Sequence, residues 1–123
     1  MSLLRPIPGR LWIVKLAEEL SRRIERHVRS WPSSQKEDLG DQLLRSTDSI
    51  GENICEGYAR MHVKERVHSL SYAQGFLEEA LFQLRWARER QLIPEFEANI
   101  LLGLFIRLSK GIHAFSLSQT SRR

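Results

Sequence analysis

The sequence has little of what most secreted, membrane-bound or catalytic proteins require. Its single cysteine, Cys55, excludes an intramolecular disulfide and favours a reducing compartment. The longest apolar run, residues 100–106, is interrupted by glycine and is too short to span a membrane. The first residues lack the apolar core of a cleavable secretion signal. We therefore expect a cytoplasmic protein with no membrane attachment.

Catalytic signatures are equally scarce. The sequence has no nucleophile elbow, no phosphate-binding loop and no repeated spacing of metal ligands. Its four histidines are scattered, so we expect them at surface or joint positions. These absences predict a protein that is not an enzyme and that needs no cofactor.

What the chain does have is enough material for one helical domain. It has 123 residues, of which 41% are hydrophobic and 28% charged. The formal net charge of +4 is uneven, because residues 1–36 carry +5 and residues 37–60 carry −4. A basic first helix beside an acidic second helix is an obvious pairing, and the excess positive charge suits a phosphate backbone.

Apolar residues recur at helical spacing over four stretches, residues 10–29, 34–60, 63–91 and 94–115, and no strand pattern occurs. Trp31 and Pro32 end the first stretch, and Ser34 and Glu37 resemble a capping box that opens the second. Short joins between helices predict an all-α, antiparallel, up-down-up-down four-helix bundle. We expect residues 1–9 to form an irregular lead-in, residues 10–115 the bundle and residues 116–123 a basic tail.

The last two helices carry more apolar residues than a monomeric bundle can bury. In the third, Tyr72, Phe82 and Trp86 lie off the main stripe. In the fourth, the row of Ile100, Leu104, Leu108 and Ile112 is flanked by further apolar residues. Because large exposed apolar patches mark interfaces, the pattern predicts a homo-oligomer.

The second helix has an unusual seam, and the rest of the chain is organised around it. Its predicted buried stripe mixes apolar residues with small ones: Leu39, Leu43, Ser46, Ile50, Ile54 and Gly57. Glycine costs a helix interior about 1 kcal/mol relative to alanine. A glycine on this seam therefore indicates a close approach by a neighbouring helix.

This helix also carries a recognisable motif. The run from Gln42 to Ser46, the pair Ser49-Ile50, the block Asn53-Ile54-Cys55-Glu56-Gly57 and the closing Arg60 resemble the four-helix-bundle family of 23S rRNA intervening-sequence proteins. Residues 73–79, which end in Glu79, resemble a second family segment, with Phe76 where serine is usual and Cys55 where the first block has alanine. The resemblance extends over residues 11–115. The matching signature positions are Arg45, Ser49, Asn53, Glu56, Gly57, Arg60 and Glu79.

The resemblance implies more than the fold. Related bundles assemble as rings of five subunits, and members are encoded within inserts of large-subunit rRNA genes. It therefore implies a non-enzymatic binding or scaffold module that contacts RNA or a ribonucleoprotein. A related bundle, the accessory variability determinant of diversity-generating retroelements, binds a reverse transcriptase and nucleic acid, including DNA, and implies an alternative role.

A cationic stripe on the first helix is the candidate nucleic-acid site. Spacings of 7, 11 and 14 residues from Lys15 place Arg22, Arg26 and Arg29 on one face, with Arg23 beside them. Such a row can follow phosphates. It can equally be a solvated face, or it can pair with the carboxylates of the second helix.

Three specific functional hypotheses each have a simpler structural alternative. Asn53, Glu56 and Arg60 can form a polar site, or Asn53 can bond across the bundle while Glu56 holds Arg60. Glu65 and His68, or the stacked Asp48, Glu52 and Glu56, suggest a carboxylate-bridged metalloenzyme, although such sites need their motif on two helices. Cys55 has no evident base, so it is expected to be a small buried residue.

Overall fold

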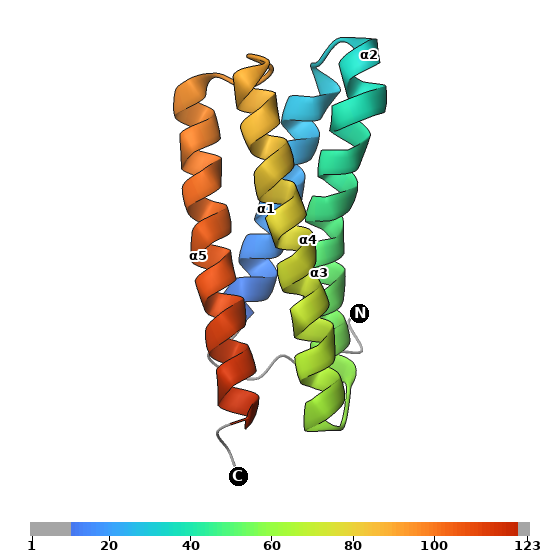
Figure 1. Cartoon of the computed structure of the whole chain (residues 1–123), viewed down its shortest axis with the longest axis vertical. Coiled ribbons are helices and arrows are strands. Elements are labelled where there is room, and N and C mark those ends of the chain that lie inside the picture. The colour runs from blue at the N-terminus through green and yellow to red at the C-terminus, as the bar shows by residue number, and fades with distance from the viewer. Residues whose placement is uncertain (1–10, 121–123) are drawn as a thin grey trace.

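The structure, a computed structural model, describes residues 11–120 and is all-α over that range. Four long helices form it: α1 (Leu11–Arg29), α3 (Asp41–Ala59), α4 (Val63–Glu89) and α5 (Glu95–Thr120). They lie side by side and each runs antiparallel to the one before it (Figure 1). The predicted all-α four-helix bundle is confirmed. The expected lead-in, residues 1–9, lies outside the described residues.

The core is built from the rows that helical periodicity predicts. The predicted stripe of the second helix is buried throughout: Leu39 lies just before α3, the other members lie in α3, and Thr47 is buried beside them. In α4 the buried row includes Leu70, Leu77 and Leu84. In α1 the buried residues are Ile13, Ala17, Leu20, Ile24 and Val28. Their burial removes apolar surface from water on all four helices, which is the main stabilising term of such a bundle.

The join between α1 and α3 differs from the prediction. The chain becomes helical again at α2 (Ser33–Gln35), with Pro32 as the residue before the first turn and no side-chain cap. The predicted capping box of Ser34 and Glu37 is therefore wrong. The backbone N–H groups of Gln35 and Lys36 donate to the Pro32 carbonyl, so the chain itself closes the first turn.

A π-helical turn, η1 (Lys36–Gly40), connects α2 to α3. It ends where the N–H of Asp41 donates to the Lys36 carbonyl, five residues back. Gly40 lies in this turn against the end of α1. A side chain there would place its Cβ 2.8 Å from Cγ1 of Val28, so the turn requires glycine at this position.

The end of α4 contains one residue in the left-handed backbone conformation, which the sequence does not predict. Gln91 has φ of 60°, its N–H donates to the Arg88 carbonyl, and the N–H of Leu92 donates to the Ala87 carbonyl. This is the Schellman arrangement, which usually has glycine where Gln91 stands. It ends the helix at Glu89, two residues before the predicted boundary.

Helix α5 continues to Thr120, five residues beyond the predicted end at residue 115. The added turn is helical because Phe115 and Gln119 are buried on the same face as the core row. That row consists of Ala98, Leu101, Phe105, Leu108 and Ile112. Ile100, which was expected on it, is 51% exposed.

One 18-residue window of α5 has a mean hydropathy of 1.4. By length and composition alone, this helix is long and apolar enough to cross a membrane. The core helix of a soluble bundle meets the same criterion. One third of the window is buried within the bundle, and the exposed apolar residues of α5 include Phe96, Ile100 and Ile106.

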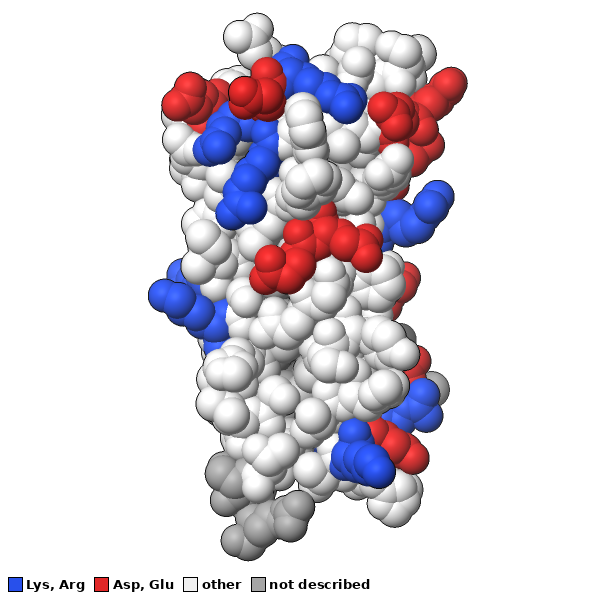
Figure 2. Space-filling model, in the orientation of Figure 1, with Lys and Arg blue, Asp and Glu red and all other residues white. Residues whose placement is uncertain are grey.

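The outer faces of α4 and α5 hold an uncharged surface. Tyr72, Phe82 and Trp86 of α4 are 54%, 61% and 44% exposed, as the sequence predicts. Between Arg66 and Glu78 no charged residue occurs on α4, and none occurs between Lys110 and Thr120 on α5. Figure 2 accordingly shows a broad area without charged side chains over the lower halves of these two helices.

Candidate nucleic-acid interface and signature helix

The cationic stripe of α1 lies on the face turned away from the core. Lys15, Arg22, Arg26 and Arg29 are exposed, whereas Arg23 is half-buried toward α5. Opposite them on the same helix lie the buried residues of the core row. The helix is therefore amphipathic in a simple way, with one apolar face and one cationic face.

The ion pairs of this stripe stay within α1. Nη2 of Arg22 lies 3.1 Å from Glu19, and Nε of Arg23 lies 2.9 Å from the other oxygen of the same carboxylate. Hydrogen bonds from Arg23 and Arg22 lower the pKa of Glu19 below its ordinary value. Nη2 of Arg29 lies 3.2 Å from Glu25. Within residues 11–120, no cation of the stripe pairs with a carboxylate of α3.

Two contacts between α1 and α5 were missed from the sequence. The guanidinium of Arg107 lies 5.6 Å from the ring centre of Trp12, a cation–π distance. Nε2 of His27 lies 2.9 Å from Oε2 of Glu97. Neither pair has a local sequence signal, because each joins residues 70 or more positions apart. Both place polar groups beside the α1 stripe.

On the signature helix, Asn53 does not bond across the bundle as one interpretation expected. Its Nδ2 donates to the Ser49 carbonyl of the same helix at 2.8 Å. Both residues are half-buried, and this intrahelical bond gives the amide N–H a partner within its own helix. Asn53 and Ser49 therefore form a local unit of α3 and not a contact between helices.

The other part of that interpretation is present in the structure. Oε1 of Glu56 lies 2.7 Å from Nη2 of Arg60, and both side chains are half exposed. Gly57 marks the close crossing of α3 and α4, because a Cβ there would lie 3.3 Å from Cδ2 of Leu70. These signature positions thus close the end of α3 and let α4 approach it.

The two signature segments meet through one hydrogen bond. The buried Ser46 hydroxyl on α3 donates to Oε1 of Glu79 on α4 at 3.3 Å. Arg45 is exposed and borders a shallow hollow of about 320 Å³ with Asp48 and Glu52. The signature positions are consequently spread along α3, and the structure does not gather them into one pocket.

Arg66 has a structural role that the sequence reading missed. Its guanidinium donates to the carbonyls of Arg60 and Met61, at 2.8 and 3.0 Å, and to the side chain of Gln119 at 2.8 Å. It therefore ties the α3–α4 joint to the end of α5. The only sequence signal was its place in the Glu65–His68 segment, which suggested a metal ligand.

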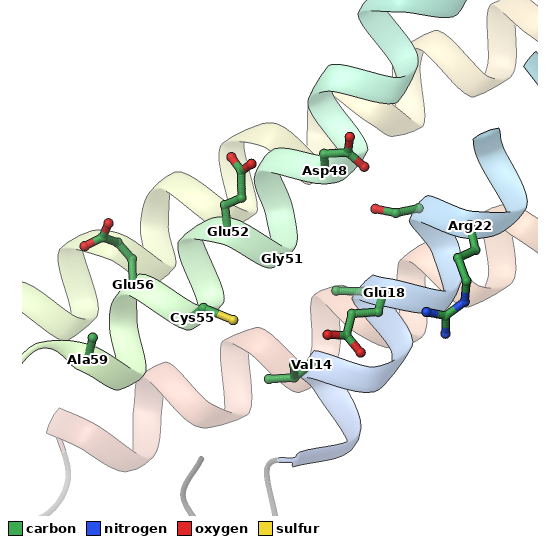
Figure 3. A pocket seen from close by; sticks show the side chains of 11 residues that line it. Val14, Glu18, Arg22, Asp48, Gly51, Glu52, Cys55, Glu56 and Ala59 are labelled. Carbon is green, nitrogen blue, oxygen red and sulfur yellow. The ribbon is translucent and has the colours of Figure 1, made fainter. Parts of the chain in front are cut away.

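A groove separates α1 from α3 and has a volume of about 780 Å³. Small residues form its floor, among them Ala17, Gly51 and Cys55. Carboxylates stand along its edges, Glu18 on α1 and Asp48, Glu52 and Glu56 on α3 (Figure 3). Arg22 is the one cation among its lining residues, and it is already paired with Glu19.

Cys55 faces this groove and is partly exposed, not fully buried as expected (Figure 3). Burial of the thiol, together with the Glu18 carboxylate, raises the pKa of Cys55 above its ordinary value. A raised pKa leaves less thiolate at neutral pH and makes the sulfur a poor nucleophile. The environment is thus the opposite of the one an activated cysteine needs.

Among the described residues, no group of three or more His, Cys, Asp or Glu side chains converges as metal ligands do. The stacked Asp48, Glu52 and Glu56 follow the groove edge one helical turn apart, so they do not surround a common point. These three carboxylates form a row along the groove edge, so each can pair with a separate cationic group.

Comparison with known proteins gives one family. The family model described as 23S rRNA-intervening sequence protein matches residues 10–114. A crystal structure of a protein of unknown function from the S23 ribosomal protein family of Bacteroides thetaiotaomicron superposes with a TM-score of 0.80 at 20% identity, covering 87% of this chain and 96% of that one. No curated protein matches the chain.

Proposed function

Because the chain belongs to the family of 23S rRNA-intervening sequence proteins, we propose that it is a non-enzymatic, homo-oligomeric binding module whose partner is RNA or a ribonucleoprotein. The observation that carries the proposal is the exposed cationic stripe of α1. Lys15, Arg22, Arg26 and Arg29 face solvent, and the ion pairs of the stripe are short-range pairs within the helix.

Intrahelical pairs of this kind do not prevent phosphate binding. Pairs between exposed side chains three or four residues apart contribute only about 0.3–0.5 kcal/mol. A phosphate oxygen can therefore replace Glu19 or Glu25 as the partner of an arginine at small cost. Repeating the stripe around an oligomer would multiply a weak contact through avidity.

The proposal is tested by titrating structured RNA against the protein at several salt concentrations. The logarithm of the association constant should fall linearly with the logarithm of salt concentration, with a slope of about −0.7 to −0.9 per neutralised phosphate. Unrelated RNA sequences should bind about equally, since contacts to phosphates carry no sequence information. Absence of binding to RNA at low salt would remove nucleic acid from the proposal and leave a protein-interaction scaffold.

Oligomer formation has independent support from two glycines. Gly75 on α4 and Gly103 on α5 are exposed, lie in helix interiors, and have nothing within 4 Å of the position a Cβ would take. Each costs the helix about 1 kcal/mol relative to alanine, and no contact within the chain explains them. The exposed Tyr72 lies three residues from Gly75, and the exposed Ile100 and Ile106 lie three residues from Gly103, so both glycines suit the close approach of another helix.

Light scattering after size exclusion tests the assembly. The parent should contain several subunits, and Phe82→Glu should reduce their number, because it replaces an exposed aromatic ring with a charged side chain. Phe82 is 61% exposed, so the change removes little core packing. Met61→Glu is the matched control, since Met61 is 85% exposed at the α3–α4 joint. A monomeric parent at micromolar concentration would refute the oligomer.

A further inference from the structure

A pocket of about 310 Å³ lies between α1 and α5, beside the cationic stripe. Six residues line it, three from each helix: Arg23, Arg26 and His27 of α1, and Glu97, Ile100 and Leu101 of α5. They lie toward the end of α1 and the start of α5 (Figure 1). Small-ligand sites span about 300–1,000 Å³, so this pocket has room for one small group.

The two arginines of this pocket have N–H donors without partners. Arg26 is exposed and forms no hydrogen bond or ion pair within residues 11–120. Arg23 bonds through Nε to Glu19, which does not line the pocket, and its terminal nitrogens form no hydrogen bond in that range. Because the two arginines lie three positions apart, they share one side of α1. Planar guanidinium donors match the oxygens of a phosphate, so the pair suits a phosphate group.

The pocket also holds one carboxylate, and that carboxylate is paired. Nε2 of His27 lies 2.9 Å from Oε2 of Glu97. An unpaired carboxylate would repel a phosphate, whereas a protonated imidazole beside it cancels its charge. The other charged groups that line the pocket are Arg23 and Arg26 on α1, and α3 contributes none. Two arginines against one carboxylate make the lining cationic, and protonation of His27 adds to that charge.

Arg26 connects the pocket to the cationic stripe, because it belongs to both. A nucleic-acid strand that follows the stripe therefore passes the pocket. We propose that the pocket binds one backbone phosphate of the RNA strand, with Arg23 and Arg26 as donors and the His27–Glu97 pair beside it. The inference rests on the proposed RNA binding and names the place where one phosphate leaves the surface and enters the protein.

Inorganic phosphate tests the pocket without RNA. Added to the full chain at about pH 6.5 and constant ionic strength, it should shift the imidazole NMR signals of His27, which are assigned with His27→Gln. Arg23→Gln/Arg26→Gln should remove the shift. Arg85→Gln/Lys110→Gln makes the same change in net charge at exposed positions outside the pocket and should retain it. Unchanged His27 signals in the parent would overturn the proposal, whether or not the protein binds RNA.

The affinity for RNA is then measured against pH. The RNA has a 5′-hydroxyl end, because a terminal phosphate itself titrates at about pH 6. In the parent, the association constant should rise roughly two- to fivefold from about pH 8 to about pH 6, since a protonated His27 and a bound phosphate stabilise each other. His27→Gln should flatten this profile, whereas His113→Gln, at an exposed position of α5, should retain it.

RNA binding and use of the pocket can fail separately. Circular dichroism verifies that the histidine variants keep the parent's helical content. If the parent binds RNA and His27→Gln leaves the pH profile unchanged, the pocket proposal is overturned and RNA binding by the stripe stands. If inorganic phosphate shifts the His27 signals but no RNA binds at low salt, the RNA assignment is overturned together with the proposed function. A phosphate-induced shift together with a pH profile that depends on His27 supports the proposal.

Discussion

Replacing Gly111 by alanine is expected to lower the free energy of unfolding by about 1–3 kcal/mol, although alanine is the better helix former. Gly111 is buried where α5 crosses α1. A Cβ at this position would lie 2.5 Å from Cη2 of Trp12 and 2.6 Å from Cγ2 of Ile13. The Trp12 ring is 39% exposed and can move outward. Ile13 cannot, because it is fully buried and β-branched, so the helices must separate.

Gly103→Ala on the same helix is the control for this substitution. Nothing lies within 4 Å of its Cβ position, so the subunit should gain up to about 1 kcal/mol from helix propensity. Urea denaturation followed by circular dichroism measures both variants. If Gly103→Ala lowers the free energy of unfolding of the assembled protein, that decrease should depend on protein concentration, as expected for a residue at a subunit interface. The decrease caused by Gly111→Ala should not depend on it. A Gly111 variant as stable as the parent would show that the crossing can relax.

Helical periodicity was sufficient to predict the bundle. The predictions failed where contacts with residues distant in the sequence determine the backbone conformation. The buried stripe of α3 follows from spacing alone, because a 3.6-residue period fixes which side chains share a face. The π-helical turn has no such signal. It places Gly40 against Val28 and Trp31, which belong to the end of α1 and its join, so only the packed structure selects it.

Composition and helical periodicity were sufficient to predict only which faces of the candidate site are charged and exposed. The exposure of the cationic stripe follows from its position opposite the core row of α1. The hydrogen bond from Asn53 to the Ser49 carbonyl does not follow from the sequence, because the side-chain rotamer determines whether the partner is intrahelical or on another helix. The groove was also invisible in sequence, since it arises where two helices present small residues at the same level.

Reversing three arginines of the stripe, Arg22→Glu/Arg26→Glu/Arg29→Glu, is expected to weaken RNA binding on the order of 100-fold at low salt. Each lost phosphate contact should also reduce the salt slope by roughly 1. All RNA sequences should be affected about equally, because these contacts position the backbone and read no bases. Folding should be retained, since all three side chains are exposed and pair at most with carboxylates of α1. Fluorescence anisotropy measures binding, and circular dichroism measures folding.

A matched reversal separates this local effect from net charge. Lys64→Glu/Arg85→Glu/Lys110→Glu makes the same change in total charge on exposed positions of α4 and α5, and should weaken binding far less. Glu19→Gln/Glu25→Gln should act in the opposite direction and strengthen binding, because it frees the arginines from their intrahelical partners. If both triple variants weaken binding equally, the stripe is not the contact surface and only the overall charge attracts RNA. If the α1 variant unfolds, its arginines stabilise the bundle, and the stripe is structural.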